Sequence, residues 1–133
     1  MKVKHKQAIE VFGEFMVGFI RDLNHLSETG WAILVEGKRD EEALRRLGFA
    51  GKIALLSGFR REGIKAFGGL MKVVILTDLD REGSVLASRC LKELSHEGLN
   101  VSLAERRRLR RSSRGLFLHI ENLSRFEDNV YLH

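Results

Sequence analysis

The sequence predicts an α/β fold of the Rossmann-like kind: a four-stranded, mainly parallel sheet flanked by helices, with an additional N-terminal amphipathic helix. Two apolar runs rich in β-branched residues, Trp31–Glu36 and Val73–Asp78, each stop abruptly at a carboxylate. Buried parallel strands have this pattern when they deliver their last residue to the open edge of a sheet. Segments of helical periodicity lie between such runs. This β-α-β order predicts right-handed crossovers and a sheet covered by helices.

The N-terminal helix is predicted over about residues 5–26. Its apolar residues recur at steps of three and four, namely Ala8, Phe12, Phe15, Phe19, Leu23 and Leu26. This stripe predicts an amphipathic helix that packs on one face of the sheet, with a dimer contact as the alternative. Glu10 and Glu14 lie in or beside the apolar stretch, which argues against a signal peptide. Since the sequence has no run of about 20 apolar residues, a membrane span is not expected.

The later elements alternate strand and helix. The predicted strands are residues 31–36, 52–56, 72–77 and 99–104, and the predicted helices are residues 40–47, 57–67 and 83–97. Asp40 is predicted to be the N-cap of the first of these helices. The tail is predicted to add a strand at 116–120. Ser124 and Glu127 then have the spacing of a capping box for a final short helix.

Composition limits the class of protein. A chain of 133 residues is most simply one domain, residues 1–133. Its net charge of +5 and isoelectric point near 9.7 favour a polyanionic partner. The single cysteine, Cys90, excludes an internal disulfide and a cysteine-based zinc site. It fits a reducing compartment, so a cytoplasmic protein is expected.

Acidic residues at the strand ends form the candidate site. All strands of a parallel sheet point the same way, so Glu36 and Asp78 are expected at one edge, where open α/β sheets bind ligands. Asp80 follows two residues after Asp78. Three carboxylates would repel one another unless a cation lies among them, and ligation by oxygen alone suits Mg²⁺ or Mn²⁺. The alternative for Asp80 is that it only caps the following helix.

The two acidic motifs resemble those of the Toprim domain, which occurs in type IA topoisomerases, bacterial-type primases, and several nucleases and recombination proteins. The matching segments are Val35–Asp40 and Leu76–Gly83. The resemblance covers about residues 31–104, the predicted Toprim core. The whole chain resembles the small stand-alone Toprim proteins of archaea and some bacteria.

The resemblance implies a catalytic metal site. In the family, acids at the positions of Glu36, Asp78 and Asp80 bind Mg²⁺ and support phosphodiester formation or cleavage. The glutamate is also assigned acid or base work. A bound metal would neutralise the charge that develops on phosphate oxygens during phosphoryl transfer, so the chemistry agrees with the residue types.

Glycines and basic residues lie beside these acids. Gly37 and Gly83 would let a backbone approach a phosphate closely, or serve only the strand-to-helix turns. Lys38, Arg39 and Arg81 are candidates to hold substrate phosphates. The alternative is that they are ordinary solvated charges or balance the charge of the metal site.

A second basic feature lies in the extension at 105–133. If this segment is helical, Arg106, Arg110 and Arg114 fall on one stripe that could follow a phosphate backbone. A solvated helix face is the alternative. The five histidines, His119 among them, show no ligand spacing and are expected to be incidental.

The predicted function is Mg²⁺-dependent action on nucleic-acid phosphodiesters, most simply as a nuclease. One alternative is a module that binds nucleic acid or a ribonucleoprotein without turnover. The last is a phosphatase of the haloacid dehalogenase type, which also has Asp-x-Asp after a strand. That class typically has Thr or Val two residues after the second Asp, whereas Glu82 stands here. The choice between RNA and DNA stays open, as does a homodimer or a place in a larger nucleic-acid-processing complex.

Overall fold

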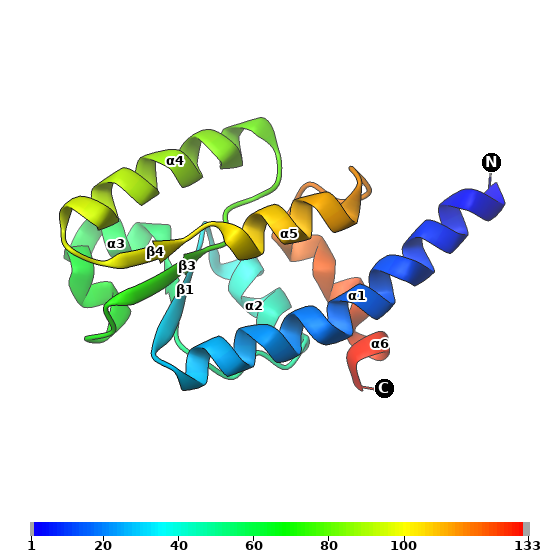
Figure 1. The fold of residues 1–133 in the computed structure, drawn as a ribbon, viewed down its shortest axis with the longest axis horizontal. Coiled ribbons are helices and arrows are strands. Elements are labelled where there is room, and N and C mark those ends of the chain that lie inside the picture. The colour runs from blue at the N-terminus through cyan, green and yellow to red at the C-terminus, as the bar shows by residue number, and fades with distance from the viewer. Residues whose placement is uncertain (1, 132–133) are drawn as a thin grey trace.

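The computed structural model describes residues 2–131, with side chains from residue 5 onward. The helices are α1 (Lys2–Glu28), α2 (Lys38–Arg46), α3 (Leu56–Glu62), α4 (Arg81–His96), α5 (Ala104–Ser113) and α6 (Glu127–Tyr131), and the 3-10 helices are η1 (Gly63–Phe67) and η2 (Ile120–Phe126). The strands are β1 (Trp31–Val35), β2 (Ile53–Leu55), β3 (Lys72–Ile75) and β4 (Asn100–Ser102). The α/β fold predicted from the sequence is confirmed (Figure 1).

The sheet brings the ends of the two central strands to one edge. Within residues 2–131 it has four strands in the order β2-β1-β3-β4, and each neighbouring pair is parallel. Ile33 in β1 lies between Ile53 in β2 and Val74 in β3. The ladder continues past β3, because the Leu76 N–H donates to the Leu34 carbonyl (2.8 Å). The residues that follow β1 and β3 therefore emerge side by side.

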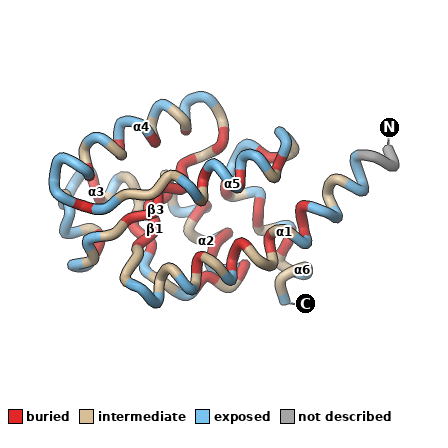
Figure 2. Tube along the Cα trace, viewed as in Figure 1, coloured by how far each residue is buried: buried red, intermediate tan, exposed pale blue. Residues whose placement is uncertain are grey.

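A hydrophobic core lies on each face of the sheet, since successive strand residues point to opposite faces. One core joins the strands to α1, α2, α5 and η2, and the other joins them to α3, η1 and α4. Figure 2 shows buried residues along the strands and on the inward sides of the helices. The predicted stripe of α1 lies in the first core, where Phe12, Phe19 and Leu23 are buried together with Met16 and Ile20 of the same helix. None of the helices in the described range is long and apolar enough to cross a membrane.

The prediction of a strand at 116–120 is wrong. One backbone bond, from the Leu79 N–H to the Leu118 carbonyl (2.7 Å), joins this segment to the β3–α4 connection, and Ile120 already begins η2. Phe117 and Ile120 of this segment pack into the core beside α1, with Leu116 partly buried against it, whereas Leu118 is exposed. The predicted capping box also does not form, because the Ser124 hydroxyl donates to the Glu121 carbonyl. The short final helix, α6, is present.

Two helix boundaries differ from the prediction. Helix α2 begins at Lys38 with Gly37 as its N-cap, so Asp40 is not the cap. Asp40 instead lies in the first turn, where its Oδ2 accepts a hydrogen bond from the Gly37 N–H (3.0 Å). The helix predicted at 57–67 is divided into α3 and η1 at Gly63, whose positive φ of 64° suits glycine.

Candidate metal centre at the carboxyl edge of the sheet

The connection from β3 to α4, residues 76–80, is a tight turn that fixes Asp78 and Asp80, and we call it the aspartate turn. The Thr77 hydroxyl donates to the Gly83 carbonyl (2.7 Å), and the Gly83 N–H donates to Asp80 Oδ1 (2.7 Å). Asp80 is thus the N-cap of α4. A Cβ atom at Gly83 would lie 1.9 Å from the Asp78 carbonyl oxygen, so no side chain fits there. Gly83 therefore serves the turn through close packing.

Backbone donors hold one oxygen of each aspartate, and the other oxygen has no backbone donor and faces His119. Asp78 Oδ1 accepts from the Ile120 N–H (2.8 Å), as Asp80 Oδ1 does from Gly83. The other two carboxylate oxygens face the Nδ1 atom of His119, Asp78 Oδ2 at 3.4 Å and Asp80 Oδ2 at 3.9 Å. Ligand atoms of Asp78, Asp80 and His119 all lie within 4.8 Å of one another. Two free carboxylate oxygens and an imidazole nitrogen at this spacing fit a divalent cation.

Glu36 lies directly beside Asp78. It follows the end of β1, and its Oε2 atom accepts a hydrogen bond from the Asp78 N–H (2.7 Å). Burial raises the pKa of Glu36, and the negative charges of Asp78 and Asp80 raise it further, against the lowering effect of the Asp78 hydrogen bond. The three acids named by the sequence therefore meet at one edge, with Glu36 linked to Asp78 through the backbone.

Arg106 lies beneath this edge and not on the surface. Its side chain is buried, with 6% of the residue exposed. The guanidinium donates to the Thr77 carbonyl (3.2 Å), the Asp78 carbonyl (2.5 Å) and the Ser84 hydroxyl (3.1 Å). The predicted surface stripe is wrong at this position, because Arg106 fastens α5 to the aspartate turn. Burial lowers the pKa of Arg106, but the guanidinium stays cationic beside the carboxylates.

The rest of the predicted stripe is also altered. Arg110 and Arg114 are exposed, but α5 ends at Ser113. Arg114 is the C-cap in the left-handed region (φ 50°), so it does not continue the helical row. Arg81, the first residue of α4, is exposed beside the aspartate turn.

The turn from β1 to α2 forms another wall of the site. A shallow cavity of about 390 Å³ is lined by Glu36, Gly37, Lys38, Arg39, Asp40, Asp78 and Glu121. Lys38 pairs with Glu41 (3.3 Å), and Arg39 approaches Glu121 of η2 (4.0 Å). A Cβ at Gly37 would meet nothing within 4 Å, so this turn is open on the cavity side.

Asp40 is a buried carboxyl in this wall. Only 7% of the residue is exposed. Burial, with the negative charge of Asp78 as the next cause, raises the pKa of Asp40 to about 6. Its role is to hold the β1–α2 turn through the Gly37 N–H.

His119 was missed by the sequence reasoning. It was expected to be incidental, yet it is the residue that faces both aspartates. A hydrogen bond with Asp78 raises the pKa of His119 above its usual value. Ligand spacing could not have found it, since it lies 41 residues from Asp78 in the sequence and reaches the site only through the fold of the tail. The one available signal was a polar residue inside the apolar run Leu116–Ile120.

Comparison with known proteins agrees with this geometry. Residues 30–105 match the Toprim domain family. A UPF0292 protein of Pyrococcus abyssi is 37% identical over 111 residues, covering 83% of this chain and 81% of that protein. A UPF0292 protein of Methanosarcina barkeri is 36% identical over 118 residues, covering 85% and 80%.

A solved structure of a protein from Aquifex aeolicus is also similar. It has a TM-score of 0.66 and 30% sequence identity, and the match covers 79% of this chain and 94% of that one. This chain therefore belongs to the Toprim domain family and, within it, to the UPF0292 proteins. The resemblance drawn from the two acidic motifs is confirmed, in preference to the haloacid dehalogenase type. His119 lies outside the matched residues 30–105.

Proposed function

We propose that this protein acts on nucleic-acid phosphodiesters with the help of a divalent cation, most simply as a nuclease that uses Mg²⁺ or Mn²⁺. The observation that carries the proposal is the pair of Oδ2 atoms of Asp78 and Asp80, which face one point beside His119 while backbone N–H groups hold the other two oxygens. Like charges held together in this way favour a cation between them. Membership of the Toprim domain family supports the link to nucleic acid.

Asp78 and Asp80 would hold the cation, and Glu36 would act as the general base or general acid. When bound, the cation would stabilise negative charge on the phosphate oxygens and on the leaving oxygen. One oxygen of Glu36 is occupied by the Asp78 N–H, which fixes the direction of the carboxylate. The second oxygen is available to accept a proton from an attacking water or to return one to the leaving group.

Basic groups around the edge would position the phosphate backbone. Lys38 and Arg39 begin α2, Arg81 begins α4, and all three are exposed. The positive ends of these helix dipoles add to the attraction for phosphate. The open space beside Gly37 supports close approach of a phosphate at that turn. Arg110 on α5 and Arg114 at the end of that helix would extend the contact along the nucleic-acid strand.

The parts of the chain would have different roles in this activity. The catalytic core would be residues 31–104, with the N-terminal helix as support for the sheet. The extension at 105–133 would contribute Arg106 beneath the aspartate turn and backbone groups to Asp78. The chain would thus work as one domain.

An activity screen on labelled RNA and DNA tests the proposal. Single-stranded and duplex substrates are incubated with Mg²⁺ or Mn²⁺ and with chelator. We expect metal-dependent cleavage that Glu36→Gln reduces far more than it reduces substrate binding, since the proton transfer is lost. Glu97→Gln, which removes an exposed carboxylate directly after the far end of α4, is the matched control. If the wild type binds nucleic acid in a metal-dependent way but does not cleave it, the protein is a binding module and not a nuclease.

A further inference from the structure

We propose that His119 is a third metal ligand, supplied by the C-terminal segment, and that its nitrogen gives the site a preference for Mn²⁺ over Mg²⁺. This inference rests on the metal site of the proposed function. It goes further by adding a ligand from outside the residues that match the Toprim domain. The pair of carboxylates from Asp78 and Asp80 would thereby become a mixed set of oxygen and nitrogen donors.

The backbone on both sides of His119 is tied to the aspartate turn. The Leu118 carbonyl accepts from the Leu79 N–H (2.7 Å), and the Ile120 N–H donates to Asp78 Oδ1 (2.8 Å). Ile120 is fully buried, which anchors the segment in the core. These contacts place the His119 backbone at the edge before any ligand binds, so little ordering would be needed.

The His119 imidazole occupies the position that a third ligand requires. Its Nδ1 atom faces the two carboxylate oxygens that no backbone donor holds, at 3.4 Å and 3.9 Å. The His119 side chain is 49% exposed and Asp80 is 29% exposed, so the cluster is open to solvent and to a substrate phosphate. Glu36 has one oxygen on the Asp78 N–H and is not part of the close group of ligand atoms.

A nitrogen donor changes which cation such a site prefers. Mg²⁺ favours oxygen ligands and keeps several of its waters, whereas imidazole binds first-row transition ions better. Mn²⁺ accepts both carboxylate oxygen and imidazole nitrogen. Two carboxylates with one imidazole should therefore bind Mn²⁺ more tightly than Mg²⁺, and His119 should account for the difference.

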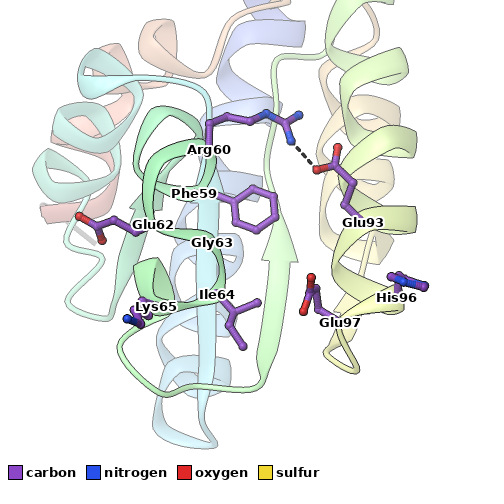
Figure 3. A pocket seen from close by; sticks show the side chains of 9 residues that line it. All are labelled: Phe59, Arg60, Glu62, Gly63, Ile64, Lys65, Glu93, His96 and Glu97. Carbon is purple, nitrogen blue, oxygen red and sulfur yellow. Dashed lines mark hydrogen bonds and ion pairs between the residues drawn. The ribbon is translucent and has the colours of Figure 1, made fainter.

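The groove between α3–η1 and α4 supplies a matched control. Figure 3 shows His96 and Glu93 of α4 there, with Glu97 directly after that helix. Glu62, the last residue of α3, also lines the groove, which thus contains a histidine and three carboxylates. In the part of the chain that the structure describes, they do not form a group with converging ligand atoms. His96→Ala thus removes an exposed imidazole without touching the proposed centre.

Metal binding to the full-length protein tests the inference without any assay of turnover. Mn²⁺ and Mg²⁺ are titrated by calorimetry into wild type, His119→Ala, His119→Gln and His96→Ala. The ¹⁴N coupling to bound Mn²⁺ is recorded by electron spin-echo spectroscopy. We expect ¹⁴N coupling in the wild type and in His96→Ala, and its loss in both His119 variants. Mn²⁺ affinity should fall roughly tenfold or more in those variants. Removing a group that only hydrogen-bonds to a metal ligand already costs about tenfold in affinity, and a direct ligand should cost at least as much.

Mg²⁺ affinity should change by less than about threefold, since Mg²⁺ keeps water readily in the vacated position. Thermal melting identifies any variant that has lost its fold, and His119→Gln keeps a side chain of similar length if His119→Ala disturbs the tail. Mn²⁺ bound at Asp78 and Asp80 without ¹⁴N coupling would overturn the role of His119 and leave the proposed function standing. Absence of metal binding in the wild type would overturn both.

Discussion

The carboxyl edge of the sheet and the α3–α4 groove both gather acidic, basic and histidine side chains, but they hold them differently. In the groove, charges neutralise one another between exposed side chains, as Arg60 and Glu93 do (Figure 3). At the edge, backbone N–H groups of Ile120, Gly83 and Asp78 hold three carboxylates. Backbone donors fix a carboxylate without cancelling its charge. The edge holds three carboxylates against one buried cation, Arg106, and the imidazole of His119, so it keeps an excess of negative charge that a bound cation would neutralise.

The largest effect is expected from removing that charge. Asp78→Asn with Asp80→Asn should lower the proposed phosphodiesterase rate by on the order of 10³-fold, because the cation loses both of its carboxylate ligands. It should also abolish the rise in melting temperature that Mn²⁺ produces by binding the folded state. Glu93→Gln with Glu97→Gln removes two carboxylates from the groove and should keep both effects. Equal losses from the two double variants would erase the distinction between the regions.

Two glycines beside the site, Gly37 after β1 and Gly83 in the first turn of α4, test how rigidly the edge is built. Gly83→Ala should cost roughly 3 kcal/mol of unfolding free energy, because its Cβ would lie 1.9 Å from the Asp78 carbonyl oxygen. Gly37→Ala should cost about 1 kcal/mol or less, the loss of a favourable N-cap residue, since the added Cβ meets nothing within 4 Å and φ is extended at −150°. Denaturant unfolding measures both. Similar costs at the two sites would show that the close packing of the aspartate turn is not what positions Asp78.

A smaller effect is expected on nucleic-acid binding. Replacing Arg110 and Arg114 by Ala should weaken binding to single-stranded RNA or DNA roughly tenfold and reduce the log–log salt slope by about 1.4 to 1.8, if both contact phosphates. Arg61→Ala with Arg89→Ala removes the same charge from exposed positions on α3 and α4 and is the control. A loss of the same size from the control pair would mean that net charge alone drives binding.

The smallest effect concerns pH and Asp40. A carboxyl whose pKa rises on folding, here from 3.8 to about 6, stabilises the fold at low pH and loses that contribution as pH rises through this window. Asp40→Asn keeps an oxygen for the Gly37 N–H but cannot ionise. In metal-free protein it should be more stable than wild type by roughly 1 kcal/mol at pH 7, with no advantage at pH 4. Melting curves across this range give the difference, and a constant offset would contradict the assigned pKa.

The sequence was informative where function follows from strand order. Abrupt strand ends at Glu36 and Asp78 predicted one sheet edge, because parallel strands must end together. The apolar stripe of α1 predicted the face that packs in the core, because its residues recur with the period of a helix. Both patterns are local, and local patterns are what a single sequence displays.

The sequence could not supply contacts that depend on the path of the tail. Arg106 and its neighbours looked alike in the arginine run, yet one turns inward to three oxygen atoms of the aspartate turn. His119 lay in an apolar run that was predicted to be a strand. Its place beside Asp78 depends on packing of the tail against α1 and α2. Such contacts join residues 22 to 41 positions apart, and no local pattern marks them.

The location of a bound cation tests the central claim most directly. Crystals of the full chain grown with Mn²⁺ are measured at an X-ray wavelength where manganese scatters anomalously. We predict an anomalous peak between Asp78 Oδ2 and Asp80 Oδ2 at the carboxyl edge of the sheet. A peak beside Glu93 and Glu97 in the α3–α4 groove, or none at the aspartate pair, would contradict the account.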